Sequence, residues 1–534
     1  MIYIIIAAIS GTIYGVYRNI YPFLFSFFLI YIFQKLSNYK EKRIKISQKN
    51  NENKTNEKKE IDILRFQFLR KNIYFLDYIF KINEKALLIF VISFIIFFEY
   101  ISFIEKQNIN FNNKENNRYK FIVLETSEKE YNNLNYIYLI NEKIYGDLIT
   151  KKNIKLDIGE KYEGVIEKIK LEGRFNPEGF DERIYFLSKG KNFKGKLKEN
   201  NILKTKTKEK ININIIVKIY KLKNDLKNIF KKYVKNESII AETLGIKEFL
   251  SEDIKEAYKN TNTYHILSIS GMHMAYIIFF LNIIGIKKEN ILKNSIFLIF
   301  FGILVGNSPS ILRSTLMFIV FNILNKFNIN IRYIDYISLI FLIIYFLNPY
   351  SIFSFGIYLS FNSVIAIKVY FNIFKEKNLR DSKYLFYKKI LEIIKINMII
   401  YLFNIPILIY FTYILNLNIL FSVFVNIILS FTIPLIMFFS FFIIFSYSFI
   451  YLLNFNLINI HLNKIHYIIG KILEYIGYFN DKIICFFSKM PFSKIYIPRI
   501  SVISILIYYL LIYFLLRSIY LIKEKKKYIL LNII

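Results

Sequence analysis

A short polar stretch opens one of the chain's apolar segments and holds residue types that could handle a charged substrate. Residues 264–274 read YHILSISGMHM, and the apolar segment continues to residue 286. Polar side chains at membrane depth are costly, so they usually face protein or water and mark a functional position. Glycine weakens a helix and serine offers the backbone alternative hydrogen bonds. Ser268, Ser270 and Gly271 therefore predict a kink or an unwound turn.

Two of the chain's four histidines belong to this stretch. His265 and His273 are eight residues apart, which on a continuous helix is a rotation of about 80°, so both would line one lumen. Unless the helix breaks, that separation is too large for one metal ion, and we expect neither a metal nor another cofactor. The alternative is an interfacial histidine pair with small residues that serve helix packing.

Composition predicts the class of protein. The chain has 534 residues, of which 54% are hydrophobic, and several apolar runs exceed 16 residues. These runs predict a polytopic α-helical membrane protein. The net charge of +33 is typical of nucleic-acid binding. A very AT-rich genome is the competing explanation, because Ile, Lys, Asn, Tyr and Phe dominate throughout and Trp is absent. The single cysteine, Cys485, excludes an intramolecular disulfide.

The apolar runs predict a series of membrane spans. We expect spans at 1–17, 20–33, 86–103, 264–286, 293–308, 310–328, 332–348, 350–372, 393–414, 416–431, 432–453 and 500–520. Residues 211–234 and 457–480 have helical spacing of apolar residues and predict amphipathic surface helices. His461 and His466 on the second helix are expected to be solvated. Asn426 is expected to bond a neighbouring helix.

A polar region between the third and fourth of these spans predicts a small β-barrel. Residues 118–125, 135–140, 160–172 and 193–198 have strand-like composition. Asn176, Pro177 and Gly179 predict a type I turn, followed by Phe180. Several cationic side chains could bind phosphates, with a simple solvated face as the alternative: Lys168, Lys170, Arg174, Lys194 and Lys196.

The domain organisation and topology follow from these segments. We expect amino-terminal spans with a basic loop over 1–104, an extracellular β domain over 105–210 and a transmembrane domain over 211–534. Basic loops favour the cytoplasm, so the 35–85 loop is expected inside and the β domain outside. The basic residues 523–527 also fall inside, provided that 416–453 contains two spans.

Several motifs together resemble one family. The run from His265 to His273 is similar to the His-Leu-Leu-Ala-Ile-Ser-Gly-Leu-His signature of the ComEC family of DNA-internalisation competence proteins. The resemblance extends over about 90–520, and its other motifs lie at 176–181, 185–190, 241–245, 309–313, 359–361 and 426–434. It implies a channel that imports single-stranded DNA across the cytoplasmic (inner) membrane during natural transformation. It also implies an extracellular OB-like domain that handles the DNA before entry.

The resemblance also implies site residues and partners. The DNA path would be lined by His265, Ser268, Ser270, Gly271, His273, Arg313 and Asn426. Arg313 would meet a phosphate, with a snorkelling interfacial arginine as the alternative. Many relatives carry a metallo-β-lactamase-like domain, but this chain has no His-x-His-x-Asp-His cluster, so we expect no such zinc centre and no enzyme activity. We expect membrane lipid, a separate ATP-driven motor, a DNA receptor and, if the second strand is degraded, a separate nuclease as partners.

Two other functions remain open on the sequence. A secondary transporter or lipid-handling permease would also contain broken helices with polar residues at mid-membrane. A lysine-rich β domain before the core and the absence of an internal repeat count against it. A membrane scaffold that conducts nothing is the third possibility, although it would not need a break at Ser270 and Gly271.

Overall fold

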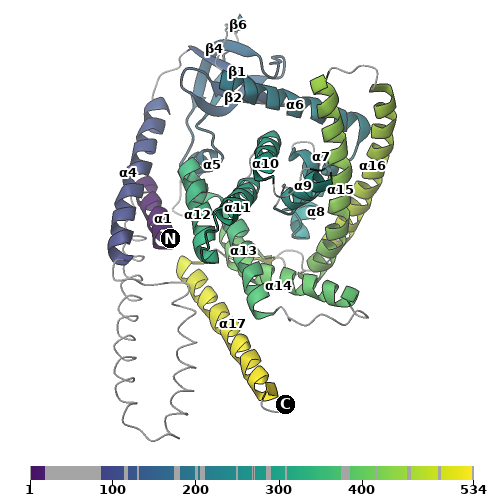
Figure 1. Ribbon diagram of the computed structural model, residues 1–534. Helices are drawn as coiled ribbons and strands as arrows, with labels where there is room; N and C mark the ends of the chain where they lie inside the picture. Colours follow the sequence, from purple (N-terminus) through teal and green to yellow (C-terminus); the bar gives the residue numbers. More distant parts are fainter. Residues whose placement is uncertain are drawn as a thin grey trace, which may run out of the picture. The chain divides into compact units, whose positions relative to one another are not determined.

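The fold is described from a computed structural model, drawn as a ribbon in Figure 1. The structure describes residues 2–17, 86–112, 118–128, 131–173, 181–198, 203–204, 211–247, 250–267, 269, 271–283, 285, 290–306, 309–374, 385–415, 419–453, 459–490, 495–498 and 500–531. The predicted span at 20–33, the loop at 35–85 and the turn at 176–180 lie outside these residues.

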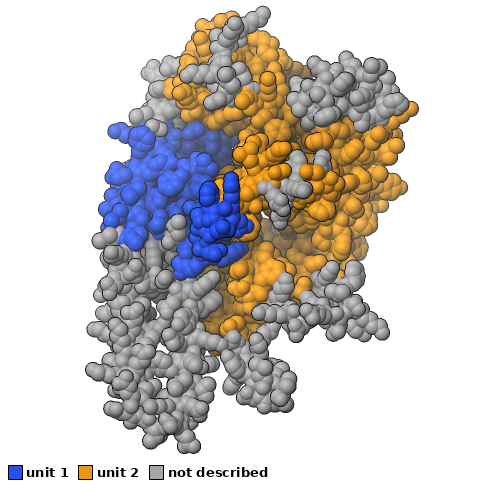
Figure 2. Space-filling view, in the orientation of Figure 1, with its two compact units in different colours: residues 1–117, 167–194, 324–353 blue, residues 118–166, 195–323, 354–534 orange. Residues whose placement is uncertain are grey.

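The chain divides into two compact units, coloured separately in Figure 2. Unit 1 contains residues 1–117, 167–194 and 324–353, and unit 2 contains 118–166, 195–323 and 354–534. The helices of unit 1 are α1 (Ile2–Tyr17), α4 (Ala86–Asn112), α5 (Glu182–Ser188), α12 (Tyr333–Leu347) and the 3-10 helix η2 (Pro349–Phe353). Helix α4 thus continues past residue 104, the boundary expected from the sequence.

Helices α1 and α4 pack closely at a glycine. A Cβ atom added to Gly11 would lie 3.1 Å from the carbonyl oxygen of Phe94 and 3.3 Å from the amide nitrogen of Phe98. The hydroxyl groups of Thr12 and Tyr345 are 3.0 Å apart, which ties α1 to α12. Small residues and hydroxyl bonds of this kind hold apolar helices together where hydrophobicity alone gives no specificity.

The predicted barrel is present. Its strands are β1 (Arg118–Glu128), β2 (Asn132–Leu139), β3 (Ile144–Lys151), β4 (Lys161–Ile169), β5 (Phe193–Leu197) and the short β6 (Leu203–Lys204). The order β1-β2-β3-β5-β4, with β4 paired back onto β1, closes a five-stranded barrel, and β6 pairs with β4. Strand β3 was not predicted, because Gly146 and Asp147 interrupt its strand-like composition. Closure leaves none of these five strands as an unpaired edge.

The remaining helices belong mostly to unit 2. They are α6 (Ile211–Tyr233), α7 (Glu237–Leu244), α8 (Glu252–Asn260), α9 (Gly271–Ile283), α10 (Ile291–Val305), α11 (Pro309–Lys326), α13 (Phe355–Ile373), α14 (Leu385–Thr412), α15 (Ile419–Leu453), α16 (Asn459–Ser488) and α17 (Val502–Leu531). The predicted amphipathic helix at 211–234 is confirmed as α6, which packs against β1 (Figure 1). A two-stranded ladder joins β7 (Ile414–Leu415) to β8 (Ile495–Tyr496).

Within the part of the chain that the structure describes, four helices are long and apolar enough to cross a membrane. These stretches are Phe355–Ile373, Ile390–Thr412, Phe421–Tyr447 and Val502–Ile522. Shorter apolar helices occur at Ile4–Ile13, Gly271–Ile283, Ile291–Val305 and Tyr333–Leu347. This composition makes the chain a membrane protein and agrees with the helical part of the predicted fold class.

The proline inside α14 is compensated by a tyrosine of α17, and a second tyrosine bonds the next carbonyl. Pro406 has no N–H group, so the carbonyl of Leu402 lacks its helical donor. The hydroxyl of Tyr508 donates to that carbonyl at 2.8 Å, and the hydroxyl of Tyr509 donates to the next one, of Phe403, at 2.9 Å. Neighbouring side chains thus satisfy the backbone groups that a proline frees within lipid.

Two predictions about helices are wrong. Residues 416–453 were expected to form two spans, but α15 is one helix of 35 residues that continues through Pro434. A proline in a membrane helix does not have to end it, because neighbours can satisfy the freed carbonyl. The inside location of 523–527 depended on that split and no longer follows. The predicted span at 264–286 is also shorter, since its helix, α9, covers only Gly271–Ile283.

Helix α16 is longer than predicted and packs against the α6–α7 connection. A Cβ on Gly470 would lie 2.4 Å from the carbonyl oxygen of Tyr233, and one on Gly477 would lie 2.7 Å from Ile239. His466 was expected to be solvated, and this is wrong. Its side chain is 3% exposed and Nε2 lies 2.8 Å from the Ser446 hydroxyl of α15. The spacing of apolar residues predicted the helix, but it did not predict which residues pack against it.

Candidate functional site

The polar stretch at 264–274 begins as a turn and becomes helical at Gly271. Asn262 has φ of +57°, and the hydroxyls of Thr261 and Thr263 are 2.8 Å apart. The amide of Ile266 donates to the carbonyl of Thr263 at 2.9 Å. These bonds reverse the chain after α8, before it enters α9. Ser268 and Ser270 lie outside the described residues.

The two histidines of this stretch do not share a helix face. His265 precedes α9 and is exposed, and its Nδ1 lies 3.1 Å from the carbonyl oxygen of Asn262. His273 lies in the first turn of α9 and is 0% exposed. The rotation of about 80° that a continuous helix would give therefore does not apply, because the helix starts between the two residues, as the predicted break near Gly271 implies.

Gly271 allows the start of α9 to approach α11 closely. A Cβ atom at this position would lie 2.8 Å from Oγ of Ser314 and 3.4 Å from Nη2 of Arg313. The Ser314 hydroxyl donates to the Ser310 carbonyl at 2.7 Å and is held in place by that bond. An alanine at 271 would therefore displace the Ser314 hydroxyl from its bond to Ser310, and a larger side chain would require α9 or α11 to move.

Arg313 is held by a third helix. The residue is 9% exposed, and its Nη1 donates a hydrogen bond to the carbonyl of Ser360 in α13. Gly271, Arg313, Ser314 and Ser360 thus meet at one point, which we call the arginine contact. Sequence reasoning selected Gly271 and Arg313 but missed Ser314 and Ser360, although Ser360 belongs to the 359–361 motif. Asn426 lies half-buried on α15, and no described residue accepts a hydrogen bond from its side chain.

A cationic cleft lies between the barrel and the helices of unit 2. It is open to solvent and has a volume of about 90 Å³, and β1, the loop before β4, α6 and the α7–α8 connection line it. Its basic residues are Lys223, Lys227 and Lys247, and its one acidic residue is Glu125. Lys223 is buried and forms an ion pair with Glu125. Three lysines against one glutamate give the lining of the cleft a net positive charge.

One lysine joins this cationic cleft to the polar stretch. Lys247 lines the cleft, and its ammonium group also lies 4.7 Å from the ring centroid of Tyr264. That distance is within the range of a cation–π interaction. The cleft and the turn that begins at Tyr264 are therefore adjacent. Sequence reasoning missed this cleft, since its lysines come from separate elements and only the tertiary structure assembles them.

The cationic residues predicted in the barrel have different surroundings. Lys170 and Lys196 are exposed, whereas Lys168 is half-buried on β4. Lys194 forms an ion pair with Glu182 at 3.0 Å, so its charge is already partly balanced within the protein. Arg174 lies outside the described residues, as do Asn176, Pro177, Gly179 and Phe180.

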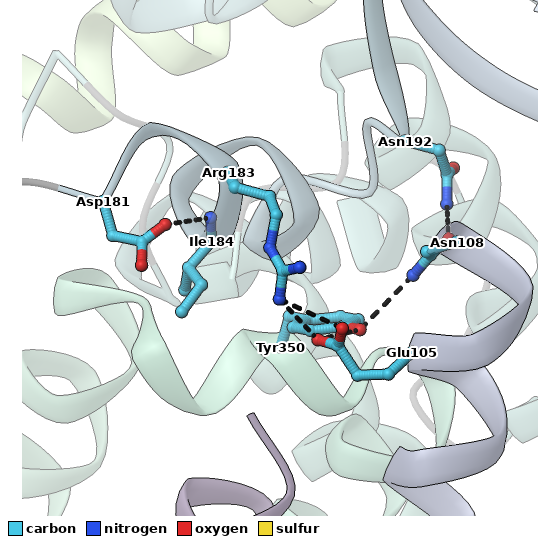
Figure 3. A network of polar contacts seen from close by, with 7 residues as sticks. All are labelled: Glu105, Asn108, Asp181, Arg183, Ile184, Asn192 and Tyr350. Carbon is cyan, nitrogen blue, oxygen red and sulfur yellow. Dashed lines mark hydrogen bonds and ion pairs between the residues drawn. The ribbon is translucent and has the colours of Figure 1, made fainter. Parts of the chain in front are cut away.

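The residues that follow the predicted turn begin α5 and anchor it within unit 1. Asp181 caps this helix by accepting from the amide of Ile184 at 2.9 Å. Figure 3 shows that Arg183 reaches Glu105 of α4, with Nη2 at 2.9 and 3.0 Å from the two carboxylate oxygens. The Tyr350 hydroxyl of η2 donates to the same carboxylate at 2.8 Å. This network stabilises the position of α5, a structural role that the turn motif alone did not reveal.

Asn108 and Asn192 extend this network. The amide of Asn192 donates to Asn108 Oδ1 at 3.0 Å, and Asn108 Nδ2 lies 3.3 Å from the Tyr350 hydroxyl (Figure 3). The segment just before β5 is thereby tied to the end of α4.

The apolar helices, the closed barrel and the buried polar residues define a helical membrane protein with a small β domain. The chain belongs to the competence protein family, whose model matches residues 243–521. The chain is also similar to ComE operon protein 3 of Bacillus subtilis (strain 168), with 30% identity over 142 residues. That match covers 25% of this chain and 18% of the relative. No solved structure matches the chain.

Proposed function

We propose that this protein is a channel that imports single-stranded DNA across the cytoplasmic membrane during natural transformation. The observation that carries the proposal is the link between the cationic cleft and the family signature, made by Lys247 and Tyr264. Lysines of an open cleft attract phosphates without reading sequence, and aromatic rings at its end can stack on bases. The β domain is proposed to be extracellular and OB-like, and to present the strand to this cleft.

The break before α9 supports a path at the membrane. Backbone outside regular helix at membrane depth is tolerated only where it is buried in protein or lines a water-filled cavity. In this proposal the passing strand is bordered by four residues of the polar stretch: His265, Ser268, Ser270 and Gly271. Three further residues lie behind these or line a later part of the path: His273, Arg313 and Asn426. The barrel cations Lys168, Lys170, Arg174, Lys194 and Lys196 would guide DNA towards the cleft.

The proposed channel would work with other proteins. An ATP-driven motor, a DNA receptor and, where the second strand is degraded, a nuclease are the partners that such a channel requires. Membrane lipid surrounds its apolar helices.

A strain that lacks the gene tests this function. Its uptake of labelled duplex DNA into a nuclease-protected single-stranded form should fall to background and return with the wild-type gene. Complementation by Lys227→Gln/Lys247→Gln should restore protein level but only part of the uptake. Normal uptake in the deletion strain would overturn the proposal.

A secondary transporter or lipid-handling permease is the second candidate, favoured by the same break before α9. The deletion strain separates the two functions. A permease would leave transformation unchanged and instead alter the transport of a small solute or the lipid composition of the membrane.

A further inference from the structure

Two carboxyl groups of unit 2 lie on either side of one tyrosine hydroxyl. Glu242 of α7 and Asp481 of α16 each place an oxygen 3.2 Å from the hydroxyl oxygen of Tyr258 in α8. Glu242 is 1% exposed, Tyr258 is 0% exposed and Asp481 is half-buried. We call Glu242 and Asp481 the acidic pair. All three residues lie outside the four helices that are long enough to cross a membrane.

Hydrogen-bond counting shows that the acidic pair needs a proton. A tyrosine hydroxyl carries one hydrogen, so it can donate to only one of the two carboxyl groups. The second contact is favourable only when that carboxyl is itself protonated and donates to the tyrosine oxygen. Two ionised carboxylates on one hydroxyl would leave one of them facing a lone pair.

The surroundings place the proton on Glu242. Asp481 accepts a second hydrogen bond, from the side-chain amide of Asn236 at 2.8 Å, which stabilises its ionised form. The second carboxyl oxygen of Glu242, Oε2, is buried and has no hydrogen-bond partner among the described residues. An ionised carboxylate in that position would lose its hydration without compensation. Tyr258 therefore donates to Asp481 and accepts from the protonated Glu242.

We propose that Glu242, Tyr258 and Asp481 form a proton-binding site that holds one proton at neutral pH and joins α7 and α8 to α16. This inference goes beyond DNA import and does not rest on it. Loss of the proton would leave two negative charges on one hydroxyl and so weaken the contact between these helices.

The other charges near the site favour the same protonation state. Burial and, to a smaller extent, the charge of Asp481 raise the pKa of Glu242 to about 8, against the opposing effect of the hydrogen bond with Tyr258. Burial also raises the pKa of Asp481, against the hydrogen bonds that it accepts. Burial raises the pKa of the Cys485 thiol, which lies one turn after Asp481 and also feels its charge. Among the described residues, no lysine or arginine forms an ion pair with either member of the acidic pair.

Infrared spectroscopy of the full-length protein in lipid nanodiscs tests the site. Difference spectra recorded across a pH series should contain the carbonyl band of a protonated carboxyl, which disappears with a midpoint near the pKa of Glu242, about 8. Glu242→Gln should remove this band. Asp481→Asn should keep the band and lower its midpoint if it folds, because the neighbouring charge is gone while the side chain can still accept hydrogen bonds.

A matched control is available on α8. Glu252 is an exposed glutamate that pairs with Lys255 at 2.8 Å, and Glu252→Gln should leave the band unchanged. A band that persists in Glu242→Gln, or a wild-type protein without a protonated carboxyl at neutral pH, would overturn the proposal. If Glu242→Gln does not fold, Tyr258→Phe provides the second test. It removes the bridge between the acidic pair and should shift the midpoint of the band, and an unshifted midpoint would also overturn the proposal.

Discussion

The cationic cleft and the arginine contact hold the same kind of charge in opposite environments. In the cleft, Lys227 and Lys247 line a space of about 90 Å³ that is open to solvent. At the arginine contact, Arg313 is 9% exposed, donates to the Ser360 carbonyl and lies against Gly271. A cation that opens onto free space is accessible to a phosphate, whereas a sealed cation must first give up its protein partner. DNA binding should therefore depend on the cleft, and helix packing on the arginine contact.

The acidic pair extends this comparison to a third environment. Arginine stays charged in proteins, so a buried arginine must be satisfied by acceptors such as the Ser360 carbonyl. A buried glutamate can instead become neutral. The open cleft should consequently respond to salt, the acidic pair to pH, and the arginine contact to neither.

Substitution of Gly271 should have the largest effect. Leucine at this position would overlap Ser314 and Arg313, so Gly271→Leu should greatly lower the amount of protein in the membrane. Gly271→Ala should destabilise the protein by about 1–3 kcal/mol, the usual cost of overpacking. Ser314→Ala should partly reverse this loss, because it removes the atom that the new Cβ would approach to 2.8 Å. Protein abundance and transformation frequency are to be measured together.

Gly356 provides the control for this prediction. Its added Cβ would have no atom closer than 3.9 Å, so Gly356→Ala should leave abundance unchanged. Gly271→Leu at wild-type abundance with uptake abolished would instead assign Gly271 to the DNA path alone and not to helix packing. Wild-type abundance with normal uptake would exclude it from both roles.

The acidic pair should make stability depend on pH. The pKa of Glu242 is raised in the folded protein, from 4.5 to about 8, so the folded state binds a proton that the unfolded state lacks between these values. The contribution of Glu242 to the free energy of unfolding is therefore largest below pH 4.5. It falls by about 1.4 kcal/mol per pH unit as the pH rises to about 8. Thermal unfolding across this range should show a flatter dependence in Glu242→Gln. If stability depended on pH equally in the wild type and in Glu242→Gln, Glu242 would not be the source of this dependence.

The cleft should determine how salt affects DNA binding. Each lysine–phosphate contact on a single strand contributes about 0.7 to the log–log slope of affinity against salt. Lys227→Gln/Lys247→Gln should therefore lower the slope by about 1.4 in fluorescence anisotropy with full-length protein and a mixed-sequence strand. Arg313→Lys should leave the slope unchanged. If Arg313→Lys changed this slope and the cleft variant did not, DNA binding would depend on the arginine contact and not on the cationic cleft.

A substitution of Lys196 tests whether the salt dependence of DNA binding is set by the position of a lysine or only by the total charge of the protein. It is exposed on the barrel and does not line the cleft. Lys196→Gln should change the slope less than either cleft substitution. An equal effect at all three lysines would favour a diffuse cationic surface.

The smallest effect is expected at the proline of α14. Tyr508→Phe removes the hydrogen bond to the Leu402 carbonyl that Pro406 leaves without a helical donor. The loss should be about 0.5–1.5 kcal/mol in thermal unfolding, with no change in the salt slope. Tyr475→Phe is the control, since Tyr475 is 83% exposed. A loss in the control equal to that of Tyr508→Phe would contradict the assignment.

Local patterns predicted many elements correctly and their neighbours poorly. Periodicity located α6, and strand-like composition located four strands of the barrel, because both depend on residues adjacent along the chain. The prediction that α15 would be two spans was wrong because a proline need not end a helix when neighbouring helices satisfy its freed carbonyl. The prediction that His466 is solvated was wrong for a related reason. The amphipathic pattern identifies a helix but not the residue, here Ser446, that contacts it.

The sequence by itself determined that this is a membrane protein with a small barrel, and its motifs identified the family and selected Gly271 and Arg313. Composition and short motifs suffice for these conclusions, since they are local properties of the chain. Only the tertiary structure decided what surrounds those residues. Ser360 lies 47 positions after Arg313 and Asp481 lies 223 positions after Tyr258, and only folding brings such distant residues together. Whether a charge is sealed, open or neutral depends on those neighbours, because burial and hydrogen bonding set the free energy of its charged form.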